Sequence, residues 1–215
     1  MSLRSRVWEA LGTVYDPELD EPITELGFVG SCVVSGSGDV SVVLRLPTPQ
    51  CAPNFAFLMA ADARLAVRRL PGVRSVSVEL QDHYTGAEIN AAVSGDGSFG
   101  DAFPGETASP DLEALRALFM RKALLARQSR LLDSGASRLG ELSGPDAARV
   151  RALRRALGID ASDSAPAFVT GDGTPVNPTD VRFRRMASLT ALSLETNGGI
   201  CRDLLHVRYG REIAV

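Results

Sequence analysis

Two β-branched runs joined by a short polar turn constrain this chain more than any other feature. The runs cover residues 29–34 and 40–46, and Gly36-Ser37-Gly38-Asp39 between them supplies the residue types of a tight turn. Alternation of apolar and polar side chains is typical of strands that bury one face. The sequence therefore predicts a β-hairpin whose apolar face other elements cover.

Helical patterns flank this hairpin. A first helix is predicted over residues 3–15, where Asp16-Pro17 interrupts the apolar spacing, and a second runs to about residue 70, where Pro71-Gly72 ends it. Alternating apolar residues over 76–80 predict a third strand. The expected fold class is α+β, with a small two-layer α-β-β-α-β domain followed by a mostly helical C-terminal region.

We expect the first domain to cover residues 1–92, a flexible Gly-rich linker to cover 93–110, and the helical region to cover 111–215. In that region Ser109-Pro110-Asp111 is typical of a helix start, and the helix should reach about residue 133. A further helix is predicted over about 143–158 with its arginines outward, before a last amphipathic segment that contains Met186, Leu189 and Leu192.

The composition narrows the classes of function. Net charge is −3, the isoelectric point is about 5.5, and 45% of the 215 residues are hydrophobic. We therefore expect no nucleic-acid partner, because the chain as a whole carries no positive field. The sequence contains no apolar run near the roughly 20 residues that span a bilayer and no signal-peptide pattern, so we expect no membrane partner and a cytoplasmic location.

Three cysteines, an odd number spaced far apart, are expected to be thiols rather than disulfides. Cys51 follows a proline-rich loop and precedes a predicted helix, whose backbone N–H groups and dipole favour a thiolate; the alternative is a small buried side chain. Cys201 follows Gly198-Gly199, which predicts a flexible turn opening a short helix, or else a place on an apolar helix face. Cys32 lies within a strand and is expected to be inert packing.

The cysteine spacing fits no zinc finger, and three cysteines cannot form a closed four-thiolate site in one chain. A bound metal would need mixed ligands, exogenous thiols or a second chain, all of which favour exchange over storage. His83 is a candidate imidazole ligand, or else a hydrogen-bonded surface residue. Asp16 and Glu18 are candidates to orient a metal or thiol, although loop capping explains them equally.

Basic residues gather in one predicted helix, and they indicate either a solvated face or a docking surface for an acidic partner. These residues are Arg116, Arg121, Lys122, Arg127 and Arg130.

Four segments taken together resemble the SufT/PaaD-type iron–sulfur assembly domain, over about residues 5–85. They are Asp16-Pro17-Glu18, Ile23 to Val29, Leu46-Pro47-Thr48-Pro49-Gln50-Cys51-Ala52-Pro53, and Leu70 to Val76. The resemblance implies a domain that matures iron–sulfur or other iron proteins, with Cys51 as its functional thiol. This chain departs from the family pattern at Ala52, where proline is common, and at His83-Tyr84, where tryptophan is common.

Residues 197–205 resemble the tail of longer relatives associated with bacterial diiron hydrocarbon monooxygenase systems, which implies a maturation factor for one client enzyme. We therefore expect a carrier that holds iron or an iron–sulfur cluster transiently and works with an apo-metalloenzyme client and the iron–sulfur assembly machinery. A homodimer would supply four thiolates. The expected cofactor-binding residues are Cys51, Cys201, Thr48, Asp16 and Glu18, and the expected metal ligands are Cys51, Cys201 and His83.

Two alternatives remain open. A thiol-dependent enzyme would use Cys51 as nucleophile and would need a positioned base such as His83. An adaptor would hold a client against an assembly factor without touching metal.

Overall fold

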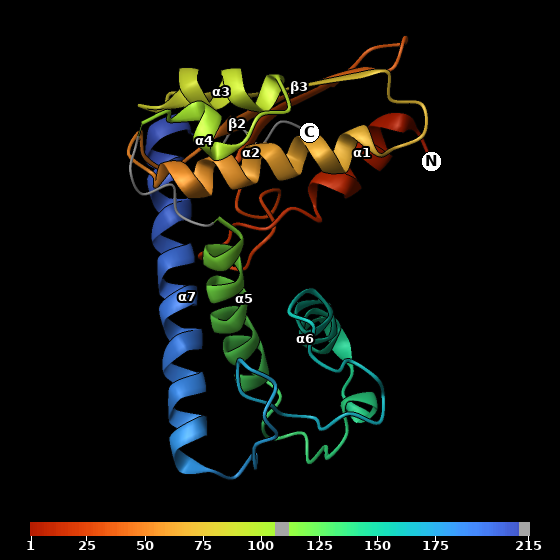
Figure 1. The fold of residues 1–215 in the computed structure, drawn as a ribbon, viewed down its shortest axis with the longest axis vertical. Coiled ribbons are helices and arrows are strands. Elements are labelled where there is room, and N and C mark those ends of the chain that lie inside the picture. Colours follow the sequence, from red (N-terminus) through yellow and green to blue (C-terminus); the bar gives the residue numbers. More distant parts are fainter. Residues whose placement is uncertain (106–111, 211–215) are drawn as a thin grey trace. The chain divides into compact units, whose positions relative to one another are not determined.

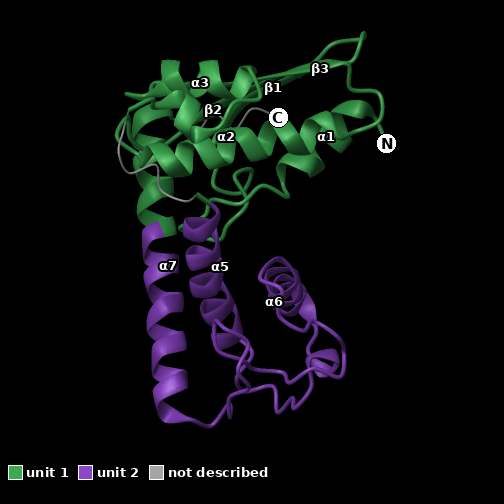
Figure 2. Ribbon diagram, in the orientation of Figure 1, with its two compact units in different colours: residues 1–112, 198–215 green, residues 113–197 purple. Residues whose placement is uncertain are grey.

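A computed structural model describes residues 1–105 and 112–210 of the protein. The chain divides into two compact units, shown in different colours in Figure 2. The first unit combines residues 1–112 with residues 198–215, and the second covers residues 113–197. The last helix of the chain therefore contributes residues to both units.

The first unit is the predicted α-β-β-α-β domain with additions, and it confirms the α+β class (Figure 1). Its elements in chain order are α1 (Leu3–Leu11), β1 (Val29–Val34), β2 (Asp39–Arg45), α2 (Pro53–Arg68), β3 (Ser75–Gln81), α3 (Gly86–Ser94), α4 (Phe99–Ala102) and the final part of α7 (Val181–Tyr209).

The three strands form one sheet in the order β1-β2-β3. β1 and β2 are the antiparallel hairpin, with a bulge between Val29 and Ser31. β2 and β3 are parallel, in register from Asp39↔Ser75 to Arg45↔Gln81. Parallel neighbours need a crossover, which α2 provides. The segments that leave β2 and β3 consequently begin at the same edge of the sheet.

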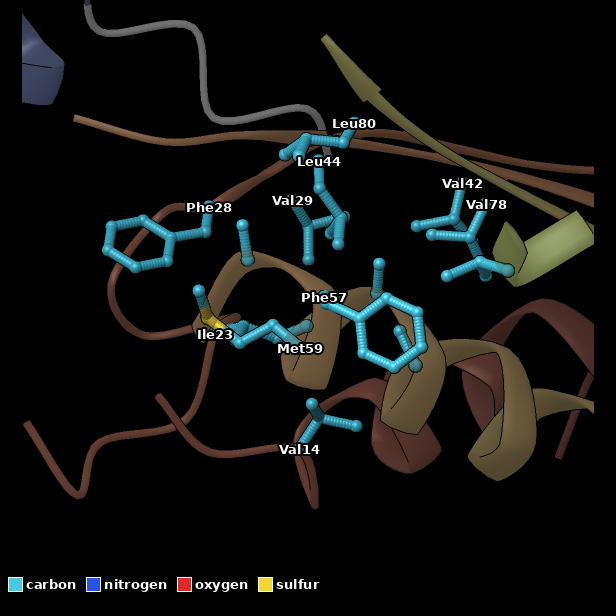
Figure 3. Close-up of a cluster of buried hydrophobic side chains, with 14 of the residues drawn as sticks. Val14, Ile23, Phe28, Val29, Val42, Leu44, Phe57, Met59, Val78 and Leu80 are labelled. Atoms are coloured by element: carbon cyan, nitrogen blue, oxygen red, sulfur yellow. The ribbon is translucent and has the colours of Figure 1, made fainter. Parts of the chain in front are cut away.

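One face of the sheet is buried against α2, as the period-two pattern predicts. Figure 3 shows Val42, Leu44 and Val78 pointing toward α2, from which Phe57 and Met59 project. The two strand residues Val42 and Leu44 are at most 1% exposed. On the opposite face Ser41, Ser77 and Glu79 are exposed, so this unit has two layers.

Within the region predicted as a flexible linker over 93–110, the described residues 93–105 include the end of α3 and all of α4. α3 packs against β3 and α2, and its Val93 is buried, as are Phe99 and Ala102 of α4. The apolar side chains in this Gly-rich stretch are spaced to reach the core, and that burial outweighs the local preference for a loop. The first helix likewise ends at Leu11, four residues before the predicted end.

The second unit is helical, as predicted. It contains α5 (Leu112–Ser129), the short 3-10 helix η1 (Leu139–Glu141), α6 (Gly144–Ala156) and the first part of α7. The predicted cap Ser109-Pro110-Asp111 lies outside the described residues. No helix in the described part of the chain has both the length and the apolar character that crossing a bilayer requires.

The arginines of α6 do not all face outward as predicted for the helix over about 143–158. Arg154 of α6 is 0% exposed and donates to the carbonyl oxygens of Pro166 and Ala167, at 2.8 and 2.7 Å. Arg127 and Arg130 of α5 both pair with Asp146, so they hold α5 to α6. The basic residues of α5 are therefore in part internal connections rather than a free docking surface.

The predicted apolar stripe of the last helix is also wrong. Met186, Leu189 and Leu192 are all more than half exposed, whereas Phe183 and Ala187 are buried in the core of the second unit. The sequence contains apolar residues on both sides of this helix, so periodicity alone did not identify the buried side.

Arg154→Met should lower the free energy of unfolding by about 3 kcal/mol, because methionine fills the space but removes two hydrogen bonds from a charged donor. Urea denaturation measures the change. Arg155→Met, on the exposed side of the same helix, is the matched control and should change stability little. Equal effects of the two substitutions would contradict a buried role for Arg154.

Candidate functional site

Cys51 lies in the loop between β2 and α2, at the carboxyl edge of the parallel strand pair. Its sulfur is 3.5 Å from the hydroxyl oxygen of Thr48, which also accepts a hydrogen bond from the backbone N–H of Gln50 at 3.3 Å. Pro53 occupies the first turn of α2, and the N-cap residue Ala52 supplies no side-chain cap. The half-buried thiol thus sits just before an uncapped helix start, with Thr48 fixing the turn around it.

His83 holds this loop from the segment that leaves β3. Its Nε2 is 2.7 Å from the carbonyl oxygen of Cys51, which can only accept, so Nε2 carries the proton. Nδ1 accepts from the backbone N–H of Thr85 at 3.3 Å. The backbone N–H of Tyr84 also donates to the carbonyl of Pro49 at 3.0 Å. Both ring nitrogens are engaged, so metal ligation by His83 would first break one of these bonds.

Cys201 reaches the same region from α7, far along the chain. The pKa of Cys201 is raised to about 11, chiefly by burial and then by the charges of Asp16, Cys51 and Glu18, while Arg202 opposes them. At neutral pH this thiol is protonated. Asp16, Glu18 and Cys51 are therefore close enough to Cys201 to influence its ionisation.

The predicted flexible turn before Cys201 is wrong, because α7 is helical throughout this stretch. A side chain on Gly198 would place its Cβ 2.7 Å from Glu21 Oε1, so glycine permits a close approach of the helix. Arg202 forms an ion pair with Glu21 one turn later. Contacts with the first unit thus outweigh the poor helix propensity of Gly198-Gly199.

Asp16 is a buried carboxyl that organises the loop before β1. Its Oδ1 accepts hydrogen bonds from the backbone N–H groups of Glu18 and Leu19, both at 2.8 Å. Burial raises the pKa of Asp16 to about 6, because the loss of hydration outweighs these two bonds. Glu18 itself is exposed. Asp16 consequently combines the expected capping role with a negative charge placed close to Cys201.

Cys32 differs from the other two cysteines. It pairs with Val42 in the hairpin and packs against the core, and burial raises the pKa of its thiol. These surroundings are consistent with the packing role that the strand position predicts.

Within residues 1–105 and 112–210, no three His, Cys, Asp or Glu side chains form a group that could hold a metal ion. Cys51 and Cys201 are instead both packed against the core of the first unit, and the carboxyl of Asp16 lies near enough to raise the pKa of Cys201. A metal bound there would need further ligands beyond these side chains.

Comparison with known proteins decides the family. The model of a family described as "Iron-sulfur cluster assembly protein" matches residues 4–80. An uncharacterised protein of Methanocaldococcus jannaschii is 33% identical over 90 residues, which are 42% of this chain and 93% of that protein. The chain belongs to the iron–sulfur cluster assembly protein family. The match to this family includes Asp16, Glu18, Thr48 and Cys51, and it ends before His83 and Cys201.

Two other proteins similar to this chain have more specific names. A Fe-S protein maturation auxiliary factor of Porphyromonas gingivalis is 36% identical over 70 residues, 33% of this chain and 65% of that protein. An iron–sulfur cluster carrier protein of Mycobacterium leprae is 36% identical over 78 residues, 36% of this chain and 20% of that protein. The chain thus spans less than two thirds of either protein.

Sequence reasoning missed the contacts from the last turn of α7, where Arg208 and Tyr209 reach the segments beside Cys51. Nothing in the local sequence around Arg208 and Tyr209 predicts that these side chains contact the segments beside Cys51. Only the pairing of β2 with β3 places their targets together.

Asp16→Asn should stabilise the protein more at pH 7.5 than at pH 4.5. The pKa of Asp16 is raised from 3.8 to about 6 in the folded state. The carboxyl therefore lowers the free energy of unfolding least below pH 3.8, and it lowers it progressively more as the pH rises through 6. Asparagine keeps an oxygen for the two backbone donors without the charge. The difference in unfolding free energy between variant and wild type should grow by about 2 kcal/mol over this pH range.

Urea denaturation at both pH values provides the measurement. Glu18→Gln, which changes an exposed carboxyl in the same loop, is the comparison variant at both pH values. A pH-independent difference for Asp16→Asn would mean that its carboxyl titrates normally.

Proposed function

We propose that this protein carries iron or an iron–sulfur cluster on Cys51 and Cys201 and delivers it to a client apo-metalloenzyme. The observation that supports the proposal most directly is that Cys51 and Cys201, two half-buried thiols from distant parts of the chain, both pack against the core of the first unit. Thiolates are the ligands that iron–sulfur clusters prefer. The family membership and the names of two relatives agree with this chemistry.

The electrostatics of the site favour cargo over a resident metal. Burial, and after it the negative neighbours, disfavour ionisation of Cys201, and a bound cation would replace its proton. Binding is thereby coupled to proton release, and a proton returning to Cys201 would weaken it. The remaining coordination positions would be filled by exogenous thiols, by the delivering or receiving protein, or by a second copy of the chain in a homodimer.

The hydrogen bonding of His83 supports a carrier over a thiol-dependent enzyme. A nucleophile needs its base bonded to the sulfur, whereas His83 Nε2 is bonded to the backbone carbonyl of Cys51. The imidazole therefore stabilises the conformation of the Cys51 loop. Metal ligation by His83 stays a proposal that requires this bond to open.

Anaerobic reconstitution with iron and sulfide tests the site. Wild-type protein should acquire thiolate-to-iron absorbance, Cys51→Ser should lose it, and Cys201→Ser should retain a weaker and more labile form. Cys32→Ser is the matched control, because its thiol packs against the core, and it should behave as wild type. Full iron binding by Cys51→Ser would contradict the site, and a fully active Cys51→Ala protein in cells would select the adaptor alternative.

The client that we propose is a diiron monooxygenase, which rests on the resemblance of residues 197–205 to the tails of relatives linked to such systems. This is the segment that carries Gly198, Cys201 and Arg202 to the site. The iron content of such an enzyme, produced with and without this protein, tests the assignment. It should fall without the protein and also with the Cys201→Ser variant, and unchanged iron content would exclude this client.

A further inference from the structure

Arg208, in the last turn of α7, bridges the two strand ends that frame the Cys51 loop. One guanidinium nitrogen donates to the carbonyl of Leu46 at 3.1 Å, and the other donates to the carbonyl of Asp82 at 2.7 Å. Leu46 directly follows β2 and Asp82 directly follows β3. Because Arg45 and Gln81 are register partners, these two carbonyls lie at neighbouring ends of parallel strands.

Tyr209 strengthens the same attachment. Its hydroxyl donates to the carboxylate of Asp82 at 3.0 Å, and the Arg45 guanidinium lies 5.1 Å from the centre of its ring. Asp82 has a left-handed backbone, with φ of 54°, which is uncommon outside glycine. Two contacts from α7 thus hold a residue whose backbone conformation is not locally favoured.

Asp82 is followed at once by His83, which is bonded to the Cys51 carbonyl at 2.7 Å. A continuous set of contacts therefore runs from Arg208 through the turn at Asp82 and His83 to Cys51. At the other end of the loop, Arg208 fixes Leu46, from which the proline-rich segment departs. Arg208 thus contacts the chain at both ends of the loop.

We infer that Arg208 is a positioning residue for Cys51, through which the terminal helix sets how often the loop opens and exposes its thiol. The inference deepens the proposed function, on which it rests only in taking Cys51 as the working thiol. The end of α7 would then have two roles, because the same helix supplies Cys201 and restrains the loop that carries Cys51.

Alkylation of a single thiol tests the inference without iron. In a Cys32→Ser, Cys201→Ser background, N-ethylmaleimide should modify Cys51 faster once Arg208→Met is added. The increase should be on the order of fivefold or more, because losing two hydrogen bonds from a charged donor raises the population of the open loop. Arg208→Lys, which lacks the planar fork that reaches two carbonyls, should give an intermediate rate.

Val207→Ala is the matched control on the same turn, since this side chain is 84% exposed, and it should leave the rate at Cys51 unchanged. A second thiol separates positioning from general destabilisation. Cys32, in a Cys51→Ser, Cys201→Ser background, should be alkylated at the same rate with and without Arg208→Met. The imidazole Nε2–H of His83 should exchange faster with solvent in Arg208→Met, as followed by NMR.

An unchanged Cys51 rate in Arg208→Met would overturn the inference, as would equal acceleration at Cys51 and Cys32. These outcomes are independent of the proposed function. The wild-type protein could fail to bind iron while Arg208→Met still accelerates alkylation of Cys51. That pair of results would exclude the carrier function and leave the positioning role of Arg208 intact.

Discussion

The parallel pairing of β2 with β3 is the constraint on which the rest of the site depends. Its register sets Arg45 beside Gln81, so the chain leaves both strands at one edge of the sheet. The Cys51 loop departs from one strand and the His83 turn from the other, close enough for a 2.7 Å hydrogen bond between them. The pairing is stabilised by burial of one sheet face against α2, which also begins directly after the loop. Core packing and site geometry therefore share the same elements.

Two titratable groups of the first unit have charged forms that burial disfavours. Asp16 is buried with its pKa raised to about 6, and Cys201 is held as a neutral thiol by burial and negative neighbours. Groups with shifted pKa values are frequent at functional sites. Relatives of this chain are named as a Fe-S protein maturation auxiliary factor and an iron–sulfur cluster carrier protein.

The final part of α7 adds contacts to the domain that lie outside the family match. The family match ends at residue 80, yet Cys201, Arg202 and Arg208 all contact the matched domain. The helix adds a second thiol and supports the loop of the first. Its attachments combine apolar packing of Leu205 against the core with the ion pair of Arg202 and the hydrogen bonds of Arg208. The helix is therefore placed to affect the loop that carries Cys51.

The sequence by itself determined the hairpin, the third strand, the α+β class and the loop that carries Cys51, because alternation, proline and glycine act locally along the chain. The four spaced motifs also determined the family. Tertiary structure alone decided that Cys201 lies beside Asp16, that Arg154 is buried, and that His83 serves the Cys51 backbone. These facts depend on which surfaces meet after folding. Local patterns do not encode such long-range contacts, and burial then overrides propensity, as it does at Gly198-Gly199 and along residues 93–102.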